Sequence, residues 1–592
     1  MQHPQNNIFD KANKITRRSF IVLFFKIFGF FLLISRAVYL QIFKAGNYLT
    51  LSDKNRINVE PITPLRGNIL DAKGNLVAKN ISSYRLIFYK TSQSRVLQVI
   101  DILAETLSLP EEIAVSIRNK IAKPPKNSRT VIIDELTWQQ VIKIEENSHL
   151  LPELKIENLH IRYYPFGETF SHIVGFVGKI SKKEKNQKAI TYDNNLVIGR
   201  SGIEKFYDQK LRGNFGWQEI EVNAFGKKLR QISYKSSVVG DNLVLTIEPK
   251  LQNFIHDLYK GLSGTVIVSD YTNGNIVALV SAPSIDNNIF KKIDTRTWKN
   301  ILNDQEKPII NRAIQSLYPP GSPFKIITTL AALEAGVPAN KVFECTGGVF
   351  LGKQYFRCWH KAGHGEINMK DALIHSCNCY MYNLVKLIGY ENIIKTARIF
   401  GIGSKTGIDL PFEVNGILPN DAFKKSRFRN SWNIGDSYNL CIGQGFLSTT
   451  PMQLNVMISA IANNGILHKP KLNMDSTSEC VQIDIKPEFL NLVKSALDDV
   501  INNPKGTSYA SRSNDYNSRF SGKTGTSQVI GKRGQDKDLS SELIARKHRN
   551  HALFVGFNQN SKHKYAVTIL VEHGGGGAKA ASPIAKKIFE FI

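Results

Sequence analysis

A long apolar run near the N-terminus places the strongest constraint on this 592-residue chain. The run covers residues 19–43, which suits a tilted membrane helix of about 20 residues, and Lys26 and Arg36 within it can snorkel or face a partner helix. A cleavable signal peptide would be shorter and end in a small-residue cleavage site, and a buried core helix would not need the basic leader, residues 1–18. We therefore expect one membrane anchor with a cytoplasmic N-terminus, because basic residues favour that side, and with the remaining chain across the membrane.

The rest of the chain is too long for one core and is expected to form two domains. A boundary near Gly240 separates a mixed polar region at 44–240, which carries no catalytic signature, from a region at 241–592. Strand pairs are predicted early and late in the second region, at 265–280 and 552–571, with helical sequence between them. This order predicts an α+β fold, an antiparallel sheet flanked by helices, standing on a pedestal domain.

The formal net charge of the chain is +27. Such a charge favours contact with an anionic surface, for example membrane phosphate or an acidic polymer, although a lysine-rich, well-solvated surface explains it equally well. No nucleic-acid-binding motif is present, so we do not expect nucleic acid as a partner. Six cysteines in a chain of this length do not make a disulfide scaffold.

A turn that delivers a serine to a helix is the first sign of chemistry. Pro319-Pro320-Gly321 precede an apolar helix predicted to end at Gly336, with Ser322 as its N-cap and Pro323 as its first residue. Lys325 lies three residues after the serine and so on the same helix face. A serine becomes a nucleophile when a neighbouring base takes its proton, and burial makes a lysine such a base. Taken alone, an ordinary capping serine beside a solvated lysine fits this pattern.

Two further motifs follow in the chain. Ser376-Cys377-Asn378 can present a hydroxyl and an amide together, and Lys523-Thr524-Gly525-Thr526 lies on a predicted strand whose small residues admit a substrate backbone. Each motif is weak alone, because Ser-x-Asn recurs at 431–433 and 437–439 and Ser-x-x-Lys recurs at 561–564 in a polar turn. Their order, behind an expected membrane anchor, is specific.

This ordered set is the signature of penicillin-binding proteins and serine β-lactamases, and the chain resembles class B penicillin-binding proteins of the elongation type. The absence of a glycosyltransferase region before the pedestal argues against class A. The other stretches that carry the resemblance are Tyr318 to Lys325, Ile442 to Gly445 with Thr450-Pro451, Val571 to Gly575, Asn55 to Ile57, Pro64 to Gly67, Gly199 to Glu204 and Gly435 to Asn439.

The resemblance implies a D-Ala-D-Ala transpeptidase that cross-links peptidoglycan stem peptides. Ser322 would attack the stem-peptide carbonyl and Lys325 would take its proton, although which group is the base in such enzymes is disputed. Ser376 would relay a proton to the leaving D-alanine, and Asn378 would hold the substrate amide. An amine of a second stem peptide would then resolve the acyl-enzyme, whereas β-lactams would acylate the same serine and stay.

The last motif would bind the end of the substrate. By the same resemblance Lys523 and Thr524 would hold the terminal carboxylate or tune the electric field at Ser376, Gly525 would admit the substrate backbone, and the N–H groups of Ser322 and Thr526 would form the oxyanion hole. The expected location is the inner membrane with the catalytic domain in the periplasm. A polytopic glycosyltransferase and other proteins of the elongation complex are the partners that the family implies.

Other readings of the chain stay open at this point. A division-specific transpeptidase shares every catalytic motif, and only the Gly-Asp-Ser-Tyr-Asn stretch at 435–439 favours elongation. A carboxypeptidase or β-lactamase would transfer the acyl group to water, and no deacylating glutamate is recognisable. A non-catalytic β-lactam sensor would need a multi-span signalling module, and a scaffold would not be acylated at all.

Four potential metal ligands lie in one short window: Cys345, Cys358, His364 and Cys377. Three thiolates and an imidazole fill a closed tetrahedral zinc site, and some elongation-type relatives hold a structural zinc at matching places with a mix of Asp, His and Cys. Free buried thiols or a disulfide in an oxidising compartment are the alternatives. The zinc would brace the Ser-x-Asn motif and would take no part in the chemistry.

Overall fold

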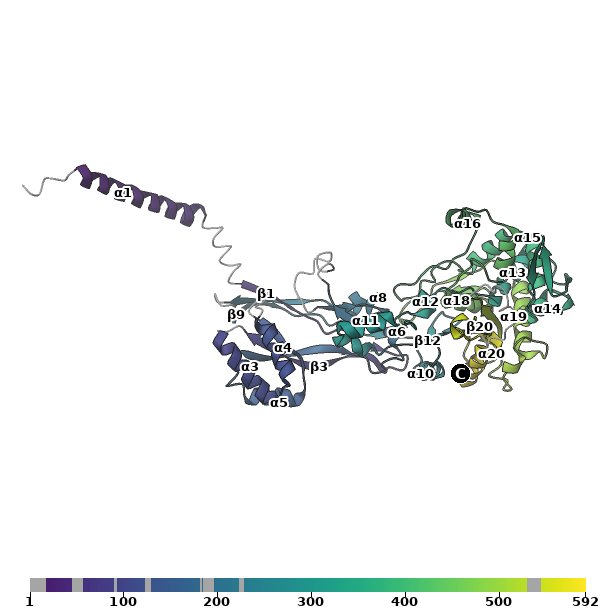
Figure 1. Cartoon of the computed structure of the whole chain (residues 1–592), viewed down its shortest axis with the longest axis horizontal. Helices are drawn as coiled ribbons and strands as arrows, with labels where there is room; N and C mark the ends of the chain where they lie inside the picture. The colour runs from purple at the N-terminus through teal and green to yellow at the C-terminus, as the bar shows by residue number, and fades with distance from the viewer. Residues whose placement is uncertain are drawn as a thin grey trace, which may run out of the picture. The chain divides into compact units, whose positions relative to one another are not determined.

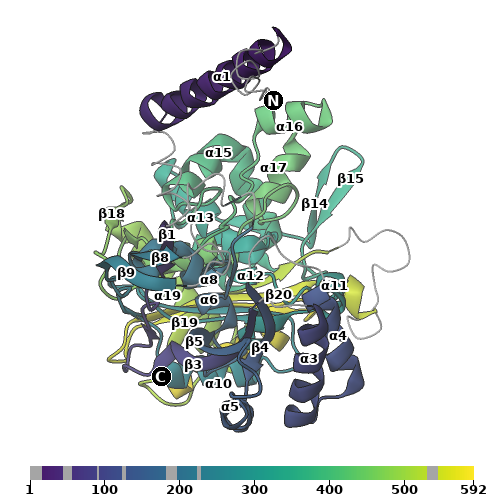
Figure 2. The ribbon, with the colours of Figure 1, turned by 90° about the vertical axis from the view of Figure 1, so that its left-hand side faces the viewer.

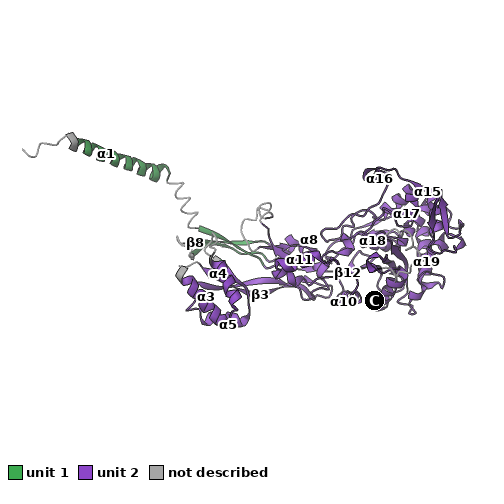
Figure 3. Cartoon of the chain, in the orientation of Figure 1, with its two compact units in different colours: residues 1–64, 123–130, 214–238 green, residues 65–122, 131–213, 239–592 purple. Residues whose placement is uncertain are grey.

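The computed structural model describes residues 17–44, 57–89, 93–122, 129–181, 184, 196–222, 228–529 and 545–592. The chain forms two compact units (Figure 3), of which the first comprises residues 1–64, 123–130 and 214–238 and the second comprises residues 65–122, 131–213 and 239–592. Most of the basic tail at 1–18 lies outside the described residues, as does the segment just before Ile57 that contributed to the family resemblance. The division of the second unit at residue 240 stays a prediction.

The first unit contains a membrane-length helix and a small sheet. Helix α1 (Arg17–Val38) continues into a π-helical turn, Tyr39–Phe43. Its apolar part, Phe20–Phe43, has a mean hydropathy of 2.2 and is entirely unburied, so it is long and apolar enough to cross a membrane. The sheet is antiparallel in the order β1 (Ile57–Ile62), β8 (Gly216–Val222) and β9 (Lys228–Lys235).

The N-terminal part of the second unit is built on a long antiparallel pair of strands. Strand β3 (Leu76–Tyr89) pairs with β5 (Leu154–Tyr163), and three helices pack beside them (Figure 1): α3 (Gln93–Leu107), α4 (Glu111–Ala122) and α5 (Trp138–Glu146). A shared apolar core of leucine, isoleucine and valine side chains holds the helices to the strands. The remaining elements are β2 (Ile69–Leu70), β4 (Arg129–Leu136), α6 (Ser171–Val174), β6 (Val177–Lys179), β7 (Val197–Gly199), α8 (Gly202–Phe206), α9 (Asp208–Arg212) and β10 (Leu243–Val244).

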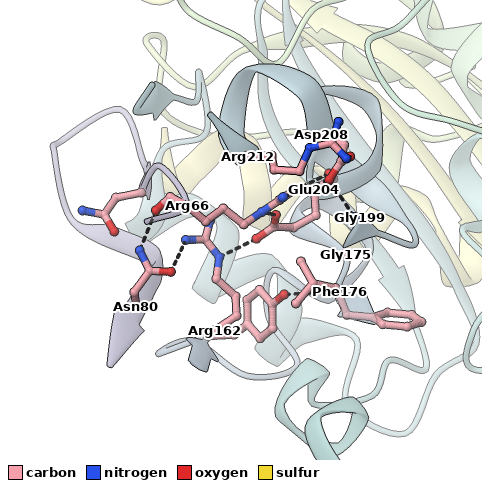
Figure 4. A network of polar contacts seen from close by, with 12 residues as sticks. Arg66, Asn80, Arg162, Gly175, Phe176, Gly199, Glu204, Asp208 and Arg212 are labelled. Atoms are coloured by element: carbon pink, nitrogen blue, oxygen red, sulfur yellow. Dashed lines mark hydrogen bonds and ion pairs between the residues drawn. The ribbon is translucent and has the colours of Figure 1, made fainter. Parts of the chain in front are cut away.

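A buried carboxylate organises the segments that follow this layer (Figure 4). Glu204 on α8 is fully buried, and its carboxylate accepts a hydrogen bond from Nε of Arg66 and another from Nε of Arg162, each at 2.6 Å. Nη1 of Arg66 also donates to Asp208 at 2.9 Å. Burial alone would raise the pKa of Glu204, but the positive charges of Arg162 and Arg66 outweigh burial and lower that pKa. The ionised carboxylate therefore ties three segments together.

The C-terminal part of the second unit is centred on a five-stranded antiparallel sheet in the order β12-β11-β21-β20-β19. Alternate residues of β20 and β21 face two separate cores, as the two-residue period of a strand requires. The residues of β11 and β12 divide between one of these cores and a third. Figure 2 shows α13, α15 and α17 on one side of the sheet and α10 on the other. The strands are β11 (Gly264–Asp270), β12 (Ile276–Ala282), β19 (Phe520–Ser527), β20 (His551–Asn558) and β21 (Tyr565–Val571). The predicted α+β fold, with early and late strand pairs, is confirmed.

Helices and short hairpins fill the middle of this part of the chain. The helices are α10 (Pro249–Leu258), α11 (Thr295–Asn303), α12 (Arg312–Gln315), α13 (Lys325–Glu334), α14 (Met369–Ile374), α15 (Asn378–Ile399), α16 (Asp421–Phe428), α17 (Ile434–Cys441), α18 (Pro451–Ala462), α19 (Pro487–Asn502), α20 (Gly577–Ala580) and α21 (Ser582–Phe591). The short strands are β13 (Phe343–Cys345), β14 (Gly348–Leu351), β15 (Gln354–Arg357), β16 (Gly365–Ile367), β17 (Ile466–His468) and β18 (Cys480–Gln482).

The start of α13 corrects one detail of the sequence analysis. Ser322 was expected to cap this helix, but Ser322–Phe324 form a 3₁₀ turn and the α-helix begins at Lys325. Gly321 is the N-cap of this 3₁₀ turn, with a φ of +59° that is open to glycine and costly for other residues, and Phe324 is the N-cap of α13. The serine hydroxyl is thus free of a capping role.

We expect Glu204→Gln to lower the free energy of unfolding by about 3–5 kcal/mol, because a neutral amide leaves the buried guanidinium of Arg162 without its counter-charge and leaves that of Arg66 with Asp208 alone. Since the folded pKa of Glu204 is depressed, its contribution is present above about pH 4.5 and is lost as the pH falls through the folded value. Urea unfolding of the full chain at pH 7 and pH 4 measures both effects.

The matched control for this prediction is Glu479→Gln, which removes the exposed pair of Glu479 with Lys469. An exposed pair contributes at most about 1 kcal/mol. Equal stability losses in the two variants would contradict the assigned role of Glu204.

Candidate active site

The predicted nucleophile lies at a close approach of a loop to the edge strand of the sheet. The N–H of Gly321 donates to the carbonyl of Gly443 at 2.8 Å. A Cβ atom on Gly321 would lie 2.7 Å from the carbonyl oxygen of Thr526, so a larger residue would push the loop away from β19. Oγ of Ser322 accepts a hydrogen bond from Oγ of Ser376 at 2.9 Å. The two serines predicted from separate motifs are thus in direct contact.

Lys325 is fully buried and holds the Ser-x-Asn motif with its amine. Nζ donates to the carbonyl oxygen of Ser376 at 2.7 Å, to Oδ1 of Asn378 at 2.7 Å and to Oγ of Ser376 at 3.2 Å. The hydrogen-bonded path from the amine to Ser322 therefore runs through Ser376. Burial lowers the pKa of Lys325 to about 8, although interactions with the nearby cysteine side chains oppose this shift. A lysine with such a pKa can accept a proton near neutral pH.

The backbone of the Ser-x-Asn turn is held in an uncommon conformation. Ser376 has a φ of +55°, a left-handed value that costs energy for any residue other than glycine. The turn is fixed on its far side by Asn378, which begins α15 and donates from Nδ2 to the carbonyl of Arg357 and from its N–H to Sγ of Cys358. The surrounding structure thus aims the Ser376 hydroxyl at Ser322.

Strand β19 supplies the opposite wall. It is the last strand of the sheet order, so one edge pairs with β20 and the other, here called the open edge, has no partner strand among the described residues. Nζ of Lys523 is fully buried and has no hydrogen-bond partner among the described residues. Burial, reinforced by the charge of Lys325, lowers the pKa of Lys523 well below its ordinary value. The N–H groups of the Lys523 amine are therefore free to donate to an anionic ligand.

Two residues of this wall bring it close to the nucleophile. A Cβ atom on Gly525 would lie 2.6 Å from Cδ of Pro323, so the glycine lets the serine loop pack directly on the strand. Gln444 donates from Nε2 to the carbonyl of Thr526 at 2.9 Å. The sequence analysis used the stretch around Gln444 only for family resemblance and gave this residue no role, because its partner lies 82 positions away.

The four predicted metal ligands come together beneath the Ser-x-Asn turn. Nδ1 of His364 lies 3.5 Å from Sγ of Cys345 and 3.7 Å from Sγ of Cys358, which is 4.0 Å from Sγ of Cys377. All four donor atoms lie within 4.8 Å of one another. A Zn–S bond of 2.3 Å implies an edge of about 3.8 Å between ligands of a tetrahedral site, so the residues fit a zinc ion. All six cysteines of the chain are free, so no disulfide competes for these thiols.

The structure therefore brings the residues of the three predicted motifs together at one site, while the duplicate motifs lie elsewhere. Ser561 and Lys564 stand in the turn between β20 and β21. The other Ser-x-Asn copies belong to the start of α17 and to its interior. The chemical roles assigned to the assembled residues stay predictions.

Comparison with known proteins agrees with this geometry. The family model described as "Penicillin binding protein transpeptidase domain" matches residues 264–590, and the "Penicillin-binding Protein dimerisation domain" matches residues 61–245. The chain is 32% identical to the peptidoglycan D,D-transpeptidase MrdA of Acinetobacter baumannii, over 100% of this chain and 89% of that protein. It is 31% identical to MrdA of Escherichia coli, over 95% of this chain and 91% of that protein.

Solved structures give the same result. The chain is similar to the penicillin-binding protein PBP2 of Helicobacter pylori in its complex with MreC, with a TM-score of 0.81 and 28% identity over 90% of this chain and 99% of that one. It is also similar to PBP2 of Pseudomonas aeruginosa, with a TM-score of 0.67 and 26% identity over 90% and 96% of the two chains. The chain belongs to the class B penicillin-binding proteins, within the elongation-type group that contains the PBP2 proteins.

Proposed function

We propose that this chain is a peptidoglycan D,D-transpeptidase that cross-links stem peptides during cell elongation. The observation that carries the proposal is the buried hydrogen-bonded path from Lys325 through Ser376 to Ser322, which faces the open edge of β19. Relatives named D,D-transpeptidase align with nearly the whole chain and support the activity. Their membership of the PBP2 group favours elongation over division.

Acylation begins with a stem peptide that ends in D-Ala-D-Ala and lies as an extra strand along β19. Its terminal carboxylate meets the unused donors of Lys523 and the hydroxyl of Thr524. Oγ of Ser322 attacks the carbonyl carbon of the penultimate D-alanine, and its proton moves through Ser376 to the amine of Lys325. The N–H groups of Ser322 and Thr526 stabilise the oxyanion, each contributing about 3 kcal/mol in comparable enzymes.

Collapse of the tetrahedral intermediate breaks the peptide bond and leaves an ester on Ser322. The leaving D-alanine takes a proton from the Ser376 hydroxyl, which is replenished by Lys325. The side-chain amine of a second stem peptide then attacks the ester and forms the cross-link, and Ser322 recovers its proton. A β-lactam follows the first half of this path, and its ring-opened acyl group stays on the serine.

Membrane topology and partners follow from the same proposal. The N-terminus lies in the cytoplasm, α1 crosses the inner membrane once and the catalytic domain faces the periplasm, where its substrate is found. A polytopic glycosyltransferase that makes the glycan strands is the expected partner, together with other elongation proteins. One PBP2 relative was solved with MreC and another similar chain in a peptidoglycan synthase complex, which supports this expectation.

A structural zinc ion completes the proposal. Cys345, Cys358, His364 and Cys377 would hold it, and Nε2 of His364 is buried without a hydrogen-bond partner among the described residues, as an imidazole held through Nδ1 would allow. The ion would fix the Ser-x-Asn turn, because Cys377 lies inside that motif. Its effect is structural, since no ligand touches the expected path of the proton.

We expect Ser322→Ala to lose covalent labelling by a fluorescent penicillin, because the variant has no hydroxyl to acylate. The measurement is fluorescence of the denatured protein band on a gel. Ser561→Ala is the matched control, since its serine belongs to the duplicate motif in an exposed turn, and it should label fully. Stoichiometric labelling of Ser322→Ala would rule out this nucleophile.

Depletion of the protein in growing rod-shaped cells should cause rounding, because side-wall insertion would lose its cross-linking step while division continues. Microscopy of cell length and width over several generations measures the outcome. Filamentation would instead indicate the division-specific alternative. Re-expression of the Ser322→Ala variant should fail to restore the rod shape, which also excludes a purely scaffolding role.

Elemental analysis of the purified protein should find one zinc ion per chain. Cys345→Ser and Cys358→Ser should each lower the zinc content severalfold, because a hydroxyl is a poor zinc ligand. Cys480→Ser is the matched control, since this thiol is exposed on β18, and it should keep the metal. Essentially no zinc in the parent protein would contradict the site.

A further inference from the structure

Glu572 follows β21 directly and belongs to the Glu-His-Gly-Gly stretch to which the mechanism gives no role. Its two carboxylate oxygens have different partners. The hydroxyl of Tyr318 donates to Oε1 at 2.6 Å, and Nε of Arg312 donates to Oε2 at 3.0 Å. The backbone N–H of Glu572 donates to the carbonyl of Ser263 at 2.7 Å, which fixes this residue to the sheet. One carboxylate thus holds both ends of the segment 312–318.

These contacts lie out of water and their donors are satisfied. The side chain of Arg312 is 5% exposed and that of Glu572 is 18% exposed. The remaining guanidinium nitrogens of Arg312 donate to the carbonyl oxygens of Glu306 and Lys307. Burial, with the charge of Glu572 added, raises the pKa of Tyr318 far above its ordinary value, so its hydroxyl stays protonated and acts as a donor. A buried ion pair with its other donors satisfied is rigid, and loss of one partner is costly.

The clamped segment leads straight into the nucleophile. Tyr318 is followed by two prolines, whose fixed φ angles leave few conformations before Gly321 and Ser322. The backbone of Tyr318 also exchanges two hydrogen bonds of 2.9 Å with Thr449. The position of the Tyr318 ring therefore restricts the position of Ser322, because the backbone between them has few allowed conformations.

The chain that follows Glu572 also contacts strand β19. The chain that follows it reaches Gly577, where a Cβ atom would lie 2.4 Å from the carbonyl oxygen of Gly525 on β19. The same carboxylate-bearing segment therefore contacts the approach to Ser322 on one side and the substrate-binding strand on the other. The segment 572–577 is therefore in contact both with the chain that leads to Ser322 and with β19.

We infer that Glu572 is a positioning residue for acylation, which acts through Tyr318 and Arg312 to hold Ser322 at its working distance from β19. The inference rests on the proposed function, because it concerns the step in which Ser322 attacks. A displacement of about 1 Å in such an arrangement can slow a reaction 10²-fold without loss of binding. The effect should therefore fall on the rate of the chemical step.

The test uses the full chain in detergent and stopped-flow acylation by a fluorescent penicillin, with the dissociation constant of the initial complex and the first-order acylation rate constant obtained separately. Glu572→Gln keeps the shape but turns an N–H₂ group toward one of two donors, and Tyr318→Phe removes a single hydroxyl. We expect each variant to lower the acylation rate constant about tenfold and to leave the dissociation constant within twofold. The double variant should be no slower than the slower single variant, because both break one unit.

Glu413→Gln is the matched control. Glu413 is a buried carboxylate of the same unit, and it accepts hydrogen bonds from Thr406 and from the N–H of Gly407 and none from the residues of the proposed active site. It should lower the melting temperature and leave the acylation rate constant within twofold of the parent. An unchanged rate constant in both Glu572→Gln and Tyr318→Phe, or a loss seen only in the dissociation constant, would overturn the inference. Absence of acylation in the parent would instead refute the proposed function.

Discussion

The geometry of the proposed active site depends on one buried amine, Nζ of Lys325. Lys325 is fully buried, and three hydrogen bonds from its amine to the Ser-x-Asn turn offset the cost of removing it from water. Those bonds fix the strained backbone of Ser376 and point its hydroxyl at Ser322. The same burial brings the pKa of the amine to about 8, so one desolvated group both shapes the site and prepares it for proton transfer. A solvated lysine at the same position would do neither.

The sequence predicts much of this arrangement because the decisive residues lie in short motifs. The apolar segment at 19–43, the early and late strand pairs and the serine–lysine spacing all follow from local periodicity and turn chemistry. The start of α13 was predicted wrongly, since a serine before a proline is a common N-cap, whereas the structure has a 3₁₀ turn whose cap, Gly321, lies in close approach to Thr526 on β19. Local propensity contains no information about that approach.

Contacts between distant parts of the chain could not be predicted in this way. Glu204 meets Arg66 across 138 positions, and Gln444 meets Thr526 across 82. The sequence indicates only that these residues belong to recognisable stretches. Which carboxylate meets which guanidinium depends on how the sheets and helices pack, and the cost of an unpaired buried charge makes those pairings specific once the fold has formed.

The open edge of β19 has a consequence for what the protein can recognise. Backbone amide groups along a strand edge bind any extended chain alike, whatever side chains it carries. In the proposed function, discrimination would therefore come from the end of the bound chain, where the terminal carboxylate would meet Nζ of Lys523, which has no hydrogen-bond partner among the described residues. Under that proposal the enzyme would recognise the terminus of the stem peptide and would tolerate changes in the residues that precede it.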